Sequence, residues 1–74
     1  MKTVQWIREV HPKFGEDYWR LEVDGEPAPA RVLIFCTVMY GMQASNWEQR
    51  QTVLRLYYPH VVRLPDQINK GDQA

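Results

Sequence analysis

The sequence predicts a small α+β domain, in which an N-terminal antiparallel hairpin and a third buried strand pack on one C-terminal helix. Three observations lead to this prediction. Residues 3–23 alternate between apolar and polar side chains around a loop, residues 31–40 are apolar at nearly every position, and residues 45–48 have the spacing that begins a helix. A small all-β barrel is the alternative.

The predicted hairpin consists of two alternating segments, residues 3–11 and 17–23. Between them, residues 12–16 contain the proline and the glycine expected of a short connecting loop. Trp6 lies on the more apolar face of the first segment, and Trp19 lies on that of the second. Because aromatic side chains bury a large apolar area, we expect both tryptophans to face the core.

A tight turn and an edge segment follow the hairpin. Asp24 and Gly25 both tolerate the positive φ angle that a type I′ turn requires. Residues 26–29 then carry prolines at alternate positions, which remove backbone donors from a β-ladder. This segment therefore predicts an edge strand or a crossover rather than a central strand.

The most apolar part of the chain, residues 31–40, predicts a strand that is covered on both faces. It is rich in β-branched and aromatic side chains, which favour strands over helices. A helix is the competing interpretation, because Pro29 and Gly41 stand where a helix begins and ends.

A helix is predicted over residues 46–58. Ser45 and Glu48 have the spacing of a capping box, and Pro59 would end the helix. At about 100° per residue, the side expected to face the core carries Trp47, Leu54 and Tyr58, with Arg50, Val53 and Tyr57 beside them. Leu56 falls on the polar side. A strand that places Leu54, Leu56 and Tyr58 on one face is the alternative.

At 74 residues the chain has room for one domain. We expect residues 1–64 to form it, with a short final strand or a packed extension at 61–64. Residues 65–74 contain a single large apolar side chain, Ile68, which predicts a polar, flexible tail.

The charge balance excludes functions that depend on a field of one sign. Nine basic and nine acidic side chains give a formal net charge of zero. Residues 1–36 carry five basic and six acidic groups, and residues 37–74 carry four and three. Coating nucleic acid, binding an anionic membrane surface and mimicking DNA each need a much larger imbalance.

Groups with catalytic or metal-binding chemistry are sparse. His11, Cys36 and His60 lie far apart, with none of the spacings of a zinc site, and the glycines occur singly rather than in a phosphate-binding loop. Cys36 lies in an apolar run, so we expect a buried, reduced thiol, which suits the cytoplasm. The longest apolar stretch, residues 32–42, falls short of the roughly 20 residues that cross a bilayer, and the N-terminal residues lack an apolar signal region. We expect no catalysis, no cofactor, no metal and no membrane attachment.

The remaining candidate is a protein-binding surface. We expect Ile7, Tyr18 and Arg20 on the outer face of the hairpin, and Arg55 and Leu56 on the outer side of the helix. Exposed tyrosine and arginine are typical of interface hot spots. The sequence therefore predicts a non-catalytic regulatory or protein–protein interaction module that occupies a partner's surface or associates with itself as a homodimer. Small neutral chains of this kind are typical of prokaryotic and phage accessory proteins.

A nucleic-acid-binding protein is the alternative function. The C-terminal half intermixes arginine with tyrosine at Arg50, Arg55, Tyr57, Tyr58 and Arg63. These residue types contact phosphates and stack on bases. However, on the predicted helix Arg50 and Arg55 point in different directions and the tyrosines belong to the apolar side, so we favour the protein-binding interpretation.

Overall fold

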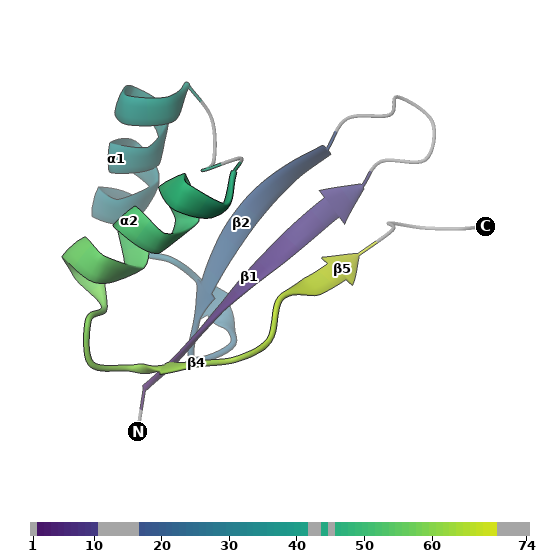
Figure 1. Ribbon diagram of the computed structural model, residues 1–74, viewed down its shortest axis with the longest axis vertical. Helices are drawn as coiled ribbons and strands as arrows, with labels where there is room; N and C mark the ends of the chain where they lie inside the picture. Colours follow the sequence, from purple (N-terminus) through teal and green to yellow (C-terminus); the bar gives the residue numbers. More distant parts are fainter. Residues whose placement is uncertain (1, 11–16, 42–43, 45, 70–74) are drawn as a thin grey trace.

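The computed structural model describes residues 2–10, 17–41, 44 and 46–69, and within them it confirms a small α+β domain (Figure 1). The chain forms, in order, β1 (Thr3–Val10), β2 (Asp17–Val23), β3 (Glu26–Pro27), α1 (Ala30–Tyr40), α2 (Trp47–Tyr57), β4 (Val62–Arg63) and β5 (Gln67–Asn69). Over these residues, no helix is long and apolar enough to span a bilayer.

The predicted hairpin is confirmed. β1 pairs antiparallel with β2, with Trp6 opposite Leu21, and residues 12–16 of the predicted loop lie outside the described residues. The Asp24-Gly25 turn is also confirmed, because both residues have positive φ angles, 54° and 81°. This turn leads into β3, which among the described strands pairs with the end of β2 alone and so forms the predicted edge strand.

The C-terminal residues complete the sheet on the other side of β1. β4 and β5 both pair with β1 in parallel, which makes β1 the central strand of a mixed sheet. Residues 67–69 were expected to belong to the polar tail but form the strand β5, and residues 70–74 lie outside the described part of the chain. The free edge of β1 accounts for this difference, since its backbone groups need partners whatever the hydropathy of the pairing segment. Between the two strands, the Gln5 side chain donates a hydrogen bond of 2.9 Å to the Pro65 carbonyl.

The predicted third strand is wrong, because residues 30–40 form the helix α1. The competing interpretation, a helix between Pro29 and Gly41, predicted both ends of α1 correctly. Pro29 occupies the N-cap, and Gly41 ends the helix with a left-handed φ of 77° while its N–H donates to the Thr37 carbonyl. Val32 and Cys36, one turn apart, are fully buried, so tertiary packing overrides the strand preference of the β-branched side chains.

The predicted C-terminal helix is confirmed as α2, but its cap lies one residue further along than predicted. The Asn46 side chain accepts from the Gln49 N–H at 2.9 Å, and the Gln49 side chain accepts from the Asn46 N–H at 3.3 Å. The predicted cap residue Ser45 lies outside the described residues. Trp47, expected in the core, is 63% exposed. It occupies the first position of the helix, before the turn that packs on the core.

The core lies between one face of the sheet and the two helices, which Figure 1 shows on the same side of the strands. Trp6 is fully buried and Trp19 packs against the core, as predicted. Arg50 is also buried, and its guanidinium lies 3.8 Å from the centre of the Trp19 ring. This cation–π contact allows α2 to place a charged side chain on its packed side.

Candidate functional site

A groove runs between α2 and the chain that follows it. Its volume is about 510 Å³, which falls within the range of ligand-binding clefts. Its lining residues come from α2, from the turn after α2, from β4 and from the start of β1. They are Val4, Trp47, Gln51, Leu54, Arg55, Tyr58, Pro59, Val61 and Arg63.

The helical period brings the first wall of the groove together. Trp47, Gln51, Leu54 and Tyr58 are separated by four, three and four residues, so they lie along one side of α2. The helix ends at Tyr58, and the chain turns at Pro59 and returns to the sheet as β4. This return provides the opposite wall.

The described lining of the groove is positively charged. It contains Arg55 and Arg63 and no aspartate or glutamate. The Arg63 guanidinium lies 3.3 Å from a carboxylate oxygen of Asp66, and both side chains are about one-third exposed. Arg55 is exposed and forms no ion pair with a described residue. In a chain of zero net charge, two arginines in one groove are a local concentration of positive charge.

Two polar groups beside the groove have no hydrogen-bond partner among the described residues. The Tyr58 hydroxyl and the Gln51 Nε2 are buried and make no hydrogen bond with any residue in the described ranges. Such groups cost about 1–3 kcal/mol each when nothing replaces their lost water. A bound oxygen acceptor that reached either group would therefore gain free energy on binding.

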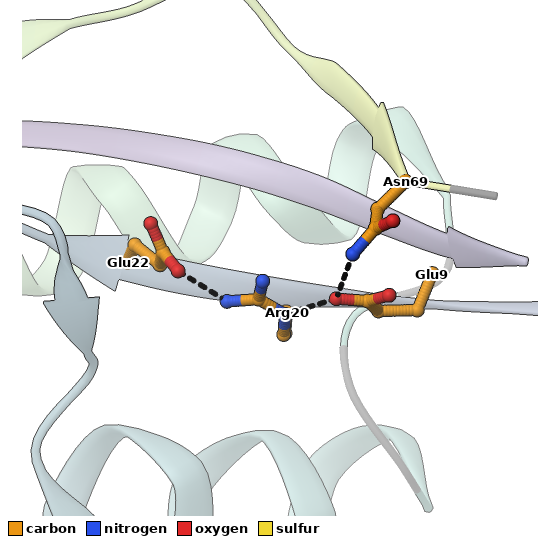
Figure 2. Close-up of polar contacts among 4 residues, drawn as sticks. All are labelled: Glu9, Arg20, Glu22 and Asn69. Atoms are coloured by element: carbon orange, nitrogen blue, oxygen red, sulfur yellow. Dashed lines mark hydrogen bonds and ion pairs between the residues drawn. The ribbon is translucent and has the colours of Figure 1, made fainter. Parts of the chain in front are cut away.

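The structure places the predicted site residues Tyr18 and Arg20 on the opposite face of the molecule. Both alternate with the core residue Trp19 on β2, and Tyr18 is 37% exposed. Arg20 forms ion pairs with Glu9 and Glu22, and Asn69 of β5 also donates to Glu9 (Figure 2). Burial alone would lower the pKa of Arg20, but the hydrogen bonds and charges of Glu22 and Glu9 outweigh it and raise that pKa. Arg20 is therefore part of a structural network that links three strands.

Ile7 is a correction to the predicted surface. It lies on the outer face of β1, as expected, but it is only 4% exposed. The register places it between Arg20 on β2 and Gln67 on β5. Directly opposed residues of antiparallel strands have Cβ atoms about 5 Å apart, so Arg20 lies beside Ile7, and β5 occupies the other side of β1. Ile7 was expected to be exposed because residues 67–69 were predicted to be part of a tail.

The last two predicted residues, Arg55 and Leu56, are adjacent on α2 but differ in their surroundings. Both are exposed, and Leu56 is 60% exposed. Arg55 lines the groove, whereas Leu56 does not. The structure thus distributes the five predicted residues over two faces and places one of them in the groove.

Sequence reasoning missed most of the groove. Trp47 was predicted in the core but is exposed, whereas Tyr58 is buried as predicted and also lines the groove. Gln51 was not predicted as a site residue. The useful signal was the mixture of arginine and aromatic residues that suggested nucleic-acid binding. The structure brings together Arg55, Tyr58 and Arg63 from that set. The other two residues of that set pack on aromatic side chains. Arg50 lies over the Trp19 ring, and the rings of Tyr57 and Phe35 have centres 5.4 Å apart.

A second exposed surface lies on α1. Its outward side carries Ile34, Val38 and Met39, which are 60%, 74% and 59% exposed. The solvent-facing side of a surface helix usually carries polar residues instead. Cys36, on the packed side, is buried, and its burial raises the pKa of the thiol despite a hydrogen bond with the Ala44 backbone. Across the described residues, no three His, Cys, Asp or Glu side chains lie together as a metal site would require.

Comparison of the chain with protein-family models, with curated proteins and with solved structures found no match.

Proposed function

We propose that this protein is a non-catalytic interaction module that binds a segment of another protein in the groove beside α2. One observation carries the proposal: a single groove gathers Trp47, Tyr58, Arg55 and Arg63. Tryptophan, tyrosine and arginine are the three residue types that contribute most often to binding hot spots. The buried, reduced Cys36 supports a cytoplasmic setting for this function.

The dimensions of the groove support a peptide segment as its occupant. The wall on α2 extends from Trp47 to Tyr58, which corresponds to about 16 Å at 1.5 Å per residue. An extended segment of about five residues has the same length at 3.3 Å per residue. Apolar contacts with Leu54 and Val61 would provide affinity, and the arginines would orient the segment.

Peptide display tests the proposal. A random peptide library is selected on the whole protein, and the affinity of the enriched peptides is measured for Trp47→Ala and for Leu56→Ala as the matched control. Both substitutions remove a large exposed side chain from α2, but only Trp47 lines the groove. We expect Trp47→Ala to weaken binding by about tenfold or more, as a hot-spot residue does, and Leu56→Ala to leave it unchanged. Equal binding to both variants, or no enrichment on the wild-type protein, would contradict the proposal.

A second copy of the chain is one partner to examine directly. Light scattering of the purified protein over a range of concentrations measures whether it forms a homodimer. The exposed apolar side of α1 provides the position for the diagnostic substitution, Val38→Glu. Loss of a dimer in Val38→Glu would assign self-association to α1 and leave the groove available for another protein.

Nucleic-acid binding is the second candidate, and the same groove favours it. Arg55 and Arg63 would contact phosphates, and Trp47 would stack on a base. Polarisation of a labelled single-stranded oligonucleotide, measured at several salt concentrations, tests this candidate. Salt-dependent binding that is lost in Arg55→Ala would replace the protein-binding proposal.

A further inference from the structure

We propose that the segment bound in the groove is acidic, with a carboxylate side chain near Arg55 and Arg63 and a large apolar side chain beside Trp47. This inference rests on the proposed function, since it names the chemistry of the protein segment that the groove takes. Charge complementarity supports an acidic segment. The described lining residues include two arginines and no carboxylate, although the whole chain is neutral.

The ion pair between Arg63 and Asp66 shows where a carboxylate is held at this groove. The two groups are 3.3 Å apart and only three residues apart in the chain, and both are partly exposed. Exposed pairs of this kind contribute about 1 kcal/mol or less, so a carboxylate from a ligand can displace Asp66 from Arg63. Asp66 therefore acts as an intramolecular competitor for the acidic residue of the partner.

Arg55 provides the second positive charge, and it is available to a ligand. It is exposed, and no described residue forms an ion pair with it. A partner carboxylate that approaches Arg55 therefore breaks no existing ion pair of the described residues. This difference predicts that Arg55 contributes more to affinity than Arg63 does.

Trp47 fixes the position of the apolar side chain. It is 63% exposed at the start of α2, eight residues before Arg55. Eight residues of helix correspond to about 12 Å, which an extended segment spans in about four residues. Side chains four residues apart point to the same face of an extended segment. We therefore expect the apolar and acidic residues of the bound segment to be separated by about four positions.

The buried polar groups lie along the same wall of the groove. Gln51 is one helical turn after Trp47, and Tyr58 is one turn after Leu54. A segment that lies along this wall brings carbonyl oxygens near the unpartnered Gln51 Nε2. A small rotation of the Gln51 side chain would then complete a hydrogen bond, and the orientation of the segment would be fixed.

The test compares the peptides selected by display with matched charge variants. We expect the selected peptides to be enriched in aspartate or glutamate about four positions from an aromatic or large aliphatic residue. Arg55→Ala should weaken their binding by about tenfold at low salt, and raised salt should reduce that difference. Asp66→Asn should strengthen binding by about two- to fivefold, because it frees Arg63.

Glu48→Gln is the control for Asp66→Asn. It removes the same charge from an exposed position on α2 that does not line the groove, so it should leave affinity unchanged. If the selected peptides lose binding in Trp47→Ala but carry no acidic residue, the proposed function stands and the acidic partner is wrong. Unchanged or weaker binding in Asp66→Asn also overturns the acidic partner. If binding never depends on Trp47, both proposals fail together.

Discussion

The two helices have the same length and cover the same face of the sheet, but different interactions hold them. α1 begins at Pro29 without a side-chain cap, ends at Gly41, and is apolar on both its packed and its outward side. α2 begins with a reciprocal cap between Asn46 and Gln49, and it buries Arg50 among its apolar residues.

This difference separates two ways of specifying a helix. The local signals of α2 satisfy its first backbone donors and favour the helix before any tertiary contact forms. α1 has no side-chain cap at its N-terminus, so it depends more on burial against the sheet. Substitutions in α1 should therefore have their largest effects on the packed side, whereas α2 should also respond at its cap.

The largest expected effect is that of Val32→Ala on the packed side of α1. Val32 is fully buried, and losing two methyl groups removes about 0.8 kcal/mol for each, with a further penalty for the cavity. We expect the free energy of unfolding to fall by about 2 kcal/mol. Urea denaturation followed by circular dichroism measures this change.

Ile34→Ala is the matched control, because it shortens a larger apolar side chain that is 60% exposed on the same helix. We expect it to change the free energy of unfolding by less than about 0.5 kcal/mol. Equal losses in Val32→Ala and Ile34→Ala would show that the outward side of α1 is buried in solution, and the contrast drawn between its two sides would be wrong.

The same contrast explains how much of the fold could be predicted from the sequence. The hairpin and its following turn were predictable because alternation at Trp6 and Trp19 and the Asp24-Gly25 pair are local signals. α1 was not, because a helix that is apolar on both sides has no helical period, and its β-branched residues indicate a strand. Only Pro29 and Gly41 indicated a helix.

The candidate site was less predictable than the fold, because it depends on contacts between distant segments. Arg55 and Arg63 line the same groove because the chain reverses after Tyr58 and joins β1 as β4. The burial of Ile7 depends on β5, which pairs through its backbone and therefore leaves little trace in hydropathy. Alternation indicates the face on which a side chain lies, but not what covers that face.

The next-largest expected effect on stability is that of Arg50→Ala on the packed side of α2. Arg50→Ala removes the stacking on Trp19, where the guanidinium lies 3.8 Å from the ring centre, together with the packing of the aliphatic stem. We expect the free energy of unfolding to fall by about 1–2 kcal/mol, the range of a desolvated cation–π contact.

Arg55→Ala is the control for Arg50→Ala, since it removes the same side chain from an exposed position of the same helix. It should change stability by less than about 0.5 kcal/mol. Burial lowers the pKa of Arg50, which means that the folded protein disfavours its charged form, so Arg50→Met is also informative. A more stable Arg50→Met protein would show that packing, rather than the charge over Trp19, holds this side of α2.

The smallest effect concerns the cap that distinguishes α2 from α1. Asn46→Ala removes the acceptor for the Gln49 N–H, so we expect a loss of about 1 kcal/mol in the free energy of unfolding. Gln49→Ala leaves that hydrogen bond in place and removes the longer one that the Gln49 side chain accepts from the Asn46 N–H, at 3.3 Å, and we expect this longer hydrogen bond to contribute about 0.5 kcal/mol or less. Amide hydrogen exchange locates the effect: the first turn of α2 should exchange faster in Asn46→Ala while α1 keeps its protection. Faster exchange in both helices would mean that the cap stabilises the helical layer as a unit, because opening the start of α2 would then also release the side of α1 that packs beside it.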